Sequence, residues 1–178
     1  SAIRRKGTVN VIAELKKASP SKGLIRADFD PVNLAVELAD AGAAALSVLT
    51  EKNYFLGSID YLKDVSEKVT IPLLRKDFIY DPYQIFEARL NAASAILLIA
   101  AALSENEFKK LHSCASELGL DVLSEAHTED EMRMLADCGA KIIGVNCRDL
   151  KTFKVSPRAT AEIIARIPAD IIRVAESG

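Results

Sequence analysis

Short apolar runs alternate with helical patterns along the whole chain, and this alternation is the feature that most constrains the fold. Most of the runs are continuously apolar, which is typical of parallel strands covered by helices on both faces. Repeated strand–helix units predict an α/β protein with a parallel sheet. The predicted strands are Val9–Leu15, Ala44–Leu49, Pro72–Lys76, Ala95–Ile99, Val122–Glu125, Ile142–Asn146 and Ile171–Ala175.

The helices between these strands have recognisable starts. Asp30-Pro31 and Asp81-Pro82 each place an N-cap residue before a proline at the first helical position. Ser104–Glu107 and Thr128–Glu131 each fit a capping box. Ser156-Pro157 is expected to start the sixth helix. Seven strands and six helices are therefore predicted.

The composition favours one domain and argues against several classes of partner. The 178 residues are 49% hydrophobic, which is enough for one core. A net charge of −2 argues against nucleic acid and anionic membrane surfaces. No apolar stretch approaches the ~20 residues of a membrane span. Cys114, Cys138 and Cys147 lack metal-ligand spacing, so we expect free thiols, no metal site and a cytoplasmic location.

Two α/β architectures are compatible with the repeat. A doubly wound sheet is disfavoured because no Gly-x-Gly-x-x-Gly turn follows the first strand. The alternative is a (β/α)8 TIM barrel, and because the sequence stops at Glu176-Ser177-Gly178 we expect seven strands, with the eighth missing. Residues 1–178 would then form a single barrel domain, incomplete at the C-terminus. Its open edges would favour self-association.

Charged and polar side chains recur near the strand ends at one phase of the repeat. Because strand residues alternate between faces, Ile12, Glu14 and Lys16 share one face of the first strand. In a barrel all strands end at one rim, so such side chains converge on one cavity. Carboxylates and cations brought together there shift one another's pKa values, as general acid–base catalysis requires. The residues in phase at later strands are Lys76, Glu125, Asn146, Arg148 and Glu176.

Each of these residues also has a purely structural interpretation. Glu14 and Lys16 could form a barrel-lining ion pair, and Lys76 could pair with Asp77 in solvent. Glu125 could be a buried structural carboxylate, although an unpaired charge in an apolar strand is costly. The segment 146–149 could be a turn in which Asn and Asp bind backbone groups. His127 is a weak candidate for a contact behind Glu125.

Five segments in order resemble the indole-3-glycerol-phosphate synthase family, and the resemblance spans nearly all of the chain. The first, Ile12-Ala13-Glu14-Leu15-Lys16-Lys17-Ala18-Ser19-Pro20-Ser21, is the most specific. The others are residues 47–58, Pro72-Leu73-Leu74-Arg75-Lys76-Asp77-Phe78, residues 143–150, and Val174-Ala175-Glu176-Ser177-Gly178.

The resemblance implies a carboxy-lyase of tryptophan biosynthesis, and hence of aromatic amino-acid biosynthesis. Its phosphorylated small-molecule substrate would be 1-(2-carboxyphenylamino)-1-deoxyribulose 5-phosphate. The reaction closes the pyrrole ring with decarboxylation and dehydration, and it uses no cofactor and no metal. The product would be indole-3-glycerol phosphate.

The resemblance also implies roles for individual residues. Lys76 matches the general acid that protonates the ketone, and Glu125 matches the general base of the dehydration. Lys16 matches a lysine that contacts phosphate or shares the acid role. Glu14 and Asn146 match residues that orient the catalytic lysine and the sugar hydroxyls. Positions matching substrate-binding residues are Ser19, Phe55, Phe78, Arg148, Glu176, Ser177 and Gly178.

The sequence departs from the family pattern at two places. In Leu123–His127 the neighbours of Glu125 are the small residues Ser124 and Ala126, which thins the packing behind the base. The missing eighth strand would remove half of the phosphate site, so we expect weak substrate binding by this chain alone. Two other interpretations therefore stay open. One is a related phosphate-binding barrel such as an isomerase, and the other is a non-catalytic fragment or half of a split phosphate-binding barrel.

Overall fold

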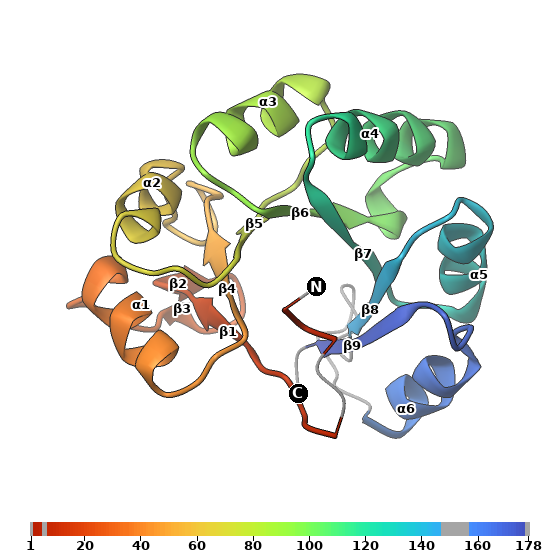
Figure 1. The fold of residues 1–178 in the computed structure, drawn as a ribbon, viewed down its shortest axis with the longest axis horizontal. Helices are drawn as coiled ribbons and strands as arrows, with labels where there is room; N and C mark the ends of the chain where they lie inside the picture. Colours follow the sequence, from red (N-terminus) through yellow and green to blue (C-terminus); the bar gives the residue numbers. More distant parts are fainter. Residues whose placement is uncertain (1, 5–6, 147–156, 177–178) are drawn as a thin grey trace. The chain divides into compact units, whose positions relative to one another are not determined.

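The computed structural model describes residues 2–4, 7–146 and 157–176 of the chain. Its seven long strands follow the order β1-β4-β5-β6-β7-β8-β9, which is their order along the chain (Figure 1). The register given for the strand pairs is parallel throughout, so the predicted parallel sheet is confirmed. The strands are β1 (Ile12–Leu15), β4 (Ala45–Leu49), β5 (Leu73–Lys76), β6 (Ala95–Ile99), β7 (Asp121–Ala126), β8 (Ile142–Asn146) and β9 (Ile172–Glu176).

The first strand is shorter than the sequence predicts. The predicted strand begins at Val9, but β1 begins at Ile12, and Val9 and Val11 are 93% and 56% exposed. Pairing with β4 starts only where Ile12 lies beside Ala45. The Val11 carbonyl oxygen still accepts the Ala44 amide at 2.9 Å, but the Val9 and Val11 side chains are exposed, so hydrophobicity alone overestimated the strand.

A short antiparallel hairpin follows β1 and was not predicted from the sequence. It joins β2 (Ala18–Ser19) to β3 (Gly23–Leu24), with Ala18 beside Leu24 and Ser19 beside Gly23. The backbone amides of Ile25 and Arg26 both donate to the carbonyl of Lys17, at 2.9 and 3.1 Å. Pro20 and Ser21 therefore lie in the turn of this hairpin, and Ser19 lies in its first strand.

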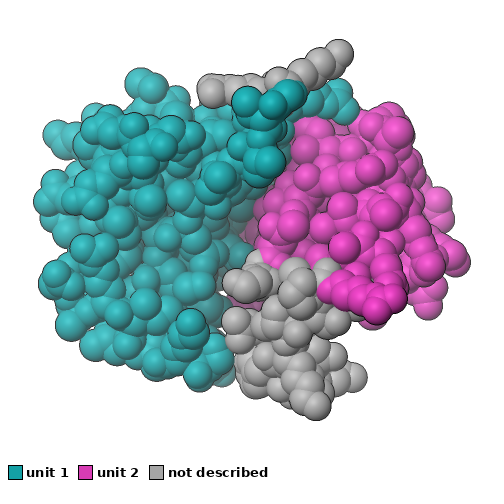
Figure 2. Space-filling model, turned by 90° about the horizontal axis from the view of Figure 1, so that it is seen from below, with its two compact units in different colours: residues 1–77, 83–96 teal, residues 78–82, 97–178 magenta. Residues whose placement is uncertain are grey.

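The contacts of the chain divide it into two compact units, coloured separately in Figure 2. Unit 1 comprises residues 1–77 and 83–96, and it contains β1 to β5 with α1 (Pro31–Asp40) and α2 (Asp60–Ser66). Asp30 caps α1 as predicted, because its carboxylate accepts the backbone amides of Val32 and Asn33. The core of this unit includes Leu15, Ala35, Leu46, Val48, Leu62 and Ile85.

Unit 2 comprises residues 78–82 and 97–178. Both predicted capping boxes are present, at Ser104 before α4 (Glu105–Glu117) and at Thr128 before α5 (Glu129–Asp137). A single 3-10 turn, Ala100–Ala102, precedes α4, and α6 (Pro157–Arg166) precedes β9. The largest fully buried side chains of this unit are Leu97, Leu98, Phe108, Leu111, Leu135, Ile143 and Ile167.

The helix α3 (Pro82–Leu90) follows β5 and begins at the Asp81-Pro82 pair that predicts it. Its buried side chains are Ile85 and Ala88, three residues apart and therefore on one face. Within the described ranges, no helix has both the length and the apolar character needed to cross a membrane.

Candidate active site

The first cluster of charged side chains lies at the carboxyl ends of β1 and β5, in unit 1. One oxygen of the Glu14 carboxylate lies 2.5 Å from the Lys16 ammonium, and the other lies 3.3 Å from the Lys76 ammonium. These three side chains are only 22–34% exposed. The structure thus brings together three of the predicted catalytic residues, with one carboxylate bridging two lysines.

A small residue on the intervening strand permits this contact. β4 lies between β1 and β5, and Ser47 of β4 pairs in register with Glu14 on one side and Leu74 on the other. Side chains two residues apart share a face, so Lys76 is on the same face as Leu74, and hence as Glu14. Ser47 is buried, and among the described residues its hydroxyl has no hydrogen-bond partner.

The two lysines control the ionisation of Glu14. Burial raises the pKa of this carboxyl, but the charge of Lys76 and the hydrogen bond and charge of Lys16 outweigh it, so the pKa lies below its ordinary value. Glu14 is therefore an anion at neutral pH. As an anion it can bind both ammonium groups at once.

The lowered pKa of Glu14 predicts a contribution to stability that depends on pH. A carboxyl whose pKa is lower in the folded state stabilises the protein fully above its unfolded pKa, near 4.5. That contribution is lost as the pH falls through the folded pKa. We expect the free energy of unfolding of the parent protein to exceed that of Glu14→Gln at pH 7, and the difference to shrink below pH 4.5.

Urea unfolding between about pH 7 and pH 3 measures this difference directly, since the slope of stability against pH reports proton uptake. Glu37→Gln is the matched control, because Glu37 is an exposed carboxyl on α1, outside the cluster. A difference between the parent protein and Glu14→Gln that does not change with pH would contradict the ionised Glu14.

The second cluster surrounds Glu125 on β7, in unit 2. Glu125 is only 3% exposed, and Asn146 at the end of β8 donates its amide to the Glu125 carboxylate at 3.2 Å. The His127 Nε2 atom lies 3.3 Å from the same oxygen. His127 is in turn adjacent to Glu131, whose carboxylate accepts the His127 backbone amide at 2.7 Å. The contact of His127 behind Glu125 is thus as the sequence analysis expected.

Gly144 holds open the space beside this cluster, a role that the sequence analysis missed. It pairs in register with Glu125 of β7 and Val174 of β9. A Cβ atom added at Gly144 would lie 2.0 Å from a carboxylate oxygen of Glu176, far closer than any real contact. The Glu176 carboxylate therefore lies over Gly144. A glycine inside an apolar strand is the sequence signal that points to such a close approach.

Gly144→Ala should displace the Glu176 carboxylate, because the added methyl group occupies its place. We expect turnover to fall by about tenfold, because the family resemblance predicts that Glu176 binds substrate and a displacement of ~1 Å is costly for such a group. Glu176→Ala is the comparison variant, because it removes the carboxylate that the added methyl group would displace. Steady-state kinetics and thermal unfolding of both variants make the comparison. Unchanged turnover in Gly144→Ala would show that the position of Glu176 is unimportant.

The remaining predicted substrate-binding residues are distributed over both units. Ser19 lies in the β2–β3 hairpin, where its hydroxyl accepts the Lys22 amide at 3.3 Å. Phe55 lies half-buried in the loop between β4 and α2, and Phe78 is 45% exposed in unit 2. The other predicted residues, Arg148, Ser177 and Gly178, lie outside the described residues.

The loop that carries Phe55 is organised by Glu51, which the sequence analysis did not single out for a role. The Glu51 carboxylate accepts the backbone amides of Asn53, Tyr54 and Phe55 at 2.6–3.1 Å. Burial raises the pKa of Glu51, but these three hydrogen bonds together lower it by more, so the pKa lies below its ordinary value. Gly57 then brings the loop back onto β4, where a Cβ atom would lie 2.3 Å from the Leu49 carbonyl oxygen.

Comparison with known sequences places the chain among curated relatives. A family model described as indole-3-glycerol phosphate synthase matches residues 2–178. An indole-3-glycerol phosphate synthase from Koribacter versatilis is 55% identical over 175 residues, which is 98% of this chain and 67% of the relative. Another, from Leptospira interrogans, is 51% identical over 171 residues, 96% of this chain and 68% of the relative.

Comparison with solved structures supports the fold alone. The structure described as native KDPGal superposes with a TM-score of 0.60 at 18% identity, covering 96% of this chain and 73% of the other. The crystal structure of phosphonopyruvate hydrolase gives a TM-score of 0.66 at 13% identity, covering 93% and 66%.

Parallel strands in sequential order, alternating with helices, define the (β/α)-barrel class of proteins. The family model covers almost the whole chain and the relatives share about half of its residues. The chain belongs to the indole-3-glycerol phosphate synthase family. The activity of this family is that of a carboxy-lyase in tryptophan biosynthesis.

Proposed function

We propose that Lys76 is the general acid of ring closure and that Glu14 orients its ammonium group for proton transfer. The observation that carries this proposal is the Glu14 carboxylate, which lies 3.3 Å from Lys76 and 2.5 Å from Lys16. A ketone oxygen that gains negative charge during carbon–carbon bond formation needs a proton donor in reach. The ammonium group of Lys76 supplies that proton, and the oxygen becomes a hydroxyl group.

Lys16 takes a second role in the same cluster. Its ammonium group shares the Glu14 carboxylate with Lys76, so the two lysines and one carboxylate carry a net charge of about +1. That charge attracts the phosphate group of the substrate, 1-(2-carboxyphenylamino)-1-deoxyribulose 5-phosphate. Ser19, which follows β1 on the hairpin, and Phe55, on the loop after β4, are proposed to contact the same substrate.

Glu125 is proposed to act as the base of the later steps. After ring closure the bond to the substrate carboxyl group breaks, carbon dioxide leaves, and its electron pair returns to the ring. The new hydroxyl group then takes a proton from the ammonium group of Lys16, which the resemblance allows to share the acid role, and leaves as water. The Glu125 carboxylate accepts the ring proton, which completes the pyrrole. The amide of Asn146 donates to the Glu125 carboxylate at 3.2 Å and holds it in place for this transfer. The other residues proposed to contact the substrate are Phe78, Arg148, Glu176, Ser177 and Gly178.

Two finer assignments from the sequence are retained as proposals. A cytoplasmic location is supported by the free thiols of Cys114 and Cys138 and by the biosynthetic role of the family. A small molecule, and not nucleic acid, is the proposed partner, which the net charge of −2 supports. Self-association stays a prediction, and light scattering on the purified protein measures it.

The test of the proposed function measures two products at once. Incubation of the intact protein with the synthetic substrate should release carbon dioxide and form fluorescent indole-3-glycerol phosphate in equal amounts. Release of carbon dioxide without the fluorescent product would contradict the reaction sequence. Formation of neither product by folded protein would favour the interpretation as a non-catalytic fragment.

A further inference from the structure

The residues on both sides of Lys76 carry charges that the proposed reaction does not use. Arg75 and Asp77 point away from Lys76, because neighbouring strand residues face opposite sides of the sheet. The Arg75 side chain is only 5% exposed and that of Asp77 only 12%. A buried ion pair stabilises a fold little compared with apolar packing, so stability alone does not explain its presence here.

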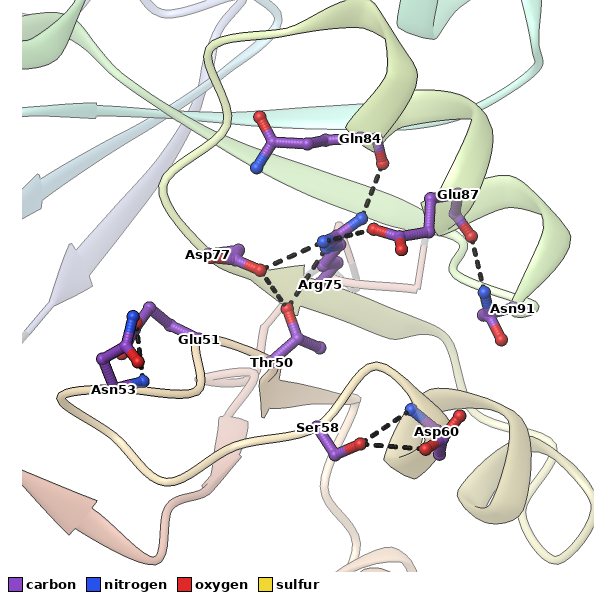
Figure 3. Close-up of polar contacts among 10 residues, drawn as sticks. All are labelled: Thr50, Glu51, Asn53, Ser58, Asp60, Arg75, Asp77, Gln84, Glu87 and Asn91. Atoms are coloured by element: carbon purple, nitrogen blue, oxygen red, sulfur yellow. Dashed lines mark hydrogen bonds and ion pairs between the residues drawn. The ribbon is translucent and has the colours of Figure 1, made fainter.

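Thr50, at the end of β4, contacts all three residues of this segment. Its backbone amide donates to the carbonyl oxygen of Lys76 at 3.1 Å. Its hydroxyl group donates to the Asp77 carboxylate at 2.5 Å and accepts from the Nε of Arg75 at 3.2 Å (Figure 3). Thr50 is 3% exposed, so water does not compete for these hydrogen bonds.

Arg75 extends the same network to α3. Its Nη2 lies 3.1 Å from the Asp77 carboxylate and 2.8 Å from that of Glu87, and its Nη1 donates to the carbonyl oxygen of Gln84 at 2.6 Å. Figure 3 shows the guanidinium group surrounded by these partners and by Thr50. All three guanidinium nitrogens are thus used, which fixes the planar group in one orientation.

The corresponding position on β7 lacks such a network. Glu125 is flanked by Ser124 and Ala126, which are uncharged and fully buried. Within the described part of the chain, β5 thus differs from β7 in having charged residues on both sides of its candidate catalytic residue. A lysine has a long flexible side chain, so its ammonium group is placed accurately only if both ends are held. Glu14 holds the ammonium end at 3.3 Å, and the network holds the backbone end.

We infer that Thr50, Arg75 and Asp77 are positioning residues that fix the backbone of Lys76 for proton transfer. The inference rests on the proposed role of Lys76 as the general acid. Thr50 is the most informative of the three to substitute. Its hydroxyl group contacts both Arg75 and Asp77, and its backbone amide donates to the Lys76 carbonyl oxygen. None of the three needs to touch the substrate.

The test compares Thr50→Val with Thr50→Ser in the intact protein. Valine retains the backbone amide and the shape but removes the hydroxyl group, whereas serine retains the hydroxyl group. We expect Thr50→Val to lower kcat by about tenfold to a hundredfold, as small misplacements of catalytic groups do, with KM changed by less than about threefold. Thr50→Ser should keep kcat close to that of the parent protein.

A merely structural role gives a different result. Thr50→Val would then unfold at a lower temperature while kcat for each folded molecule stayed unchanged, and that result would overturn the inference. If Thr50→Val does not fold, Asp77→Asn replaces it, since it keeps the side-chain volume and removes the charge. A kcat for folded Asp77→Asn equal to that of the parent protein would equally overturn the inference.

A parallel measurement on Lys76→Ala separates this inference from the proposed function. Loss of turnover in Lys76→Ala together with normal kcat in Thr50→Val leaves the proposed function intact and rejects the positioning role. Near-normal turnover in Lys76→Ala rejects the general-acid role itself, and the positioning role with it. Loss of turnover in both variants, with recovery in Thr50→Ser, supports both.

Discussion

Lys76→Ala should lower turnover by at least about a hundredfold, because it removes the group proposed to protonate the ketone, and general acids commonly contribute factors of 10²–10⁴. The loss should fall mainly on kcat, since the proton is transferred only as the transition state forms. The variant should remain folded, because Lys76 lies at the end of β5 and its side chain is 22% exposed.

The fluorescence assay of product formation measures this effect, with circular dichroism to check the fold. Lys68→Ala is the matched control, because Lys68 is an exposed lysine outside the site and its loss should leave turnover unchanged. A Lys76→Ala variant within about threefold of the parent protein would assign the proton to another donor, since real general acids contribute far more than this.

Glu125→Gln is expected to have an effect of similar size for a different chemical reason. Glutamine preserves the volume of the side chain but cannot accept the ring proton, so turnover should fall by at least about a hundredfold. The site is buried, and the Asn146 amide donates to the Glu125 carboxylate at 3.2 Å. The glutamine oxygen can accept this hydrogen bond, so we expect little change in the fold.

The timing of product release distinguishes the base from a group that only binds substrate. In Glu125→Gln the dehydration that follows decarboxylation should slow, so carbon dioxide should appear faster than the fluorescent product in a single turnover. Glu67→Gln, at an exposed position after α2, serves as the control for the chemical change. Equal slowing of both products would place Glu125 earlier in the reaction than we propose.

The sequence predicted the first cluster well because strand geometry is regular. The alternation of faces along β1 was enough to place Glu14 and Lys16 together, and the Glu14–Lys16 contact of 2.5 Å follows from it. The contact between Glu14 and Lys76 needed one more fact, that β1 and β5 flank the same strand. The chain order of the strands, which the strand–helix repeat predicted, supplied that fact.

The periodicity of the sequence did not predict side-chain contacts between residues that are far apart along the chain. Lys76 and Asp77 are neighbours in the chain, so a pair between them was a natural hypothesis. In the structure the Asp77 carboxylate contacts Arg75 and the Thr50 hydroxyl group, which comes from another strand. Likewise, no sequence period reveals that the Glu176 carboxylate lies over Gly144.

The buried serine of β4 sets a limit on how this enzyme can vary. Ser47 lies between the strands whose side chains meet at Glu14, and its hydroxyl group has no hydrogen-bond partner among the described residues. Volume, and not polarity, is therefore what the position requires. A library built to diversify the active site should tolerate alanine or glycine there. It should reject leucine or phenylalanine, whose larger side chains would push the Glu14 carboxylate away from the Lys76 ammonium group.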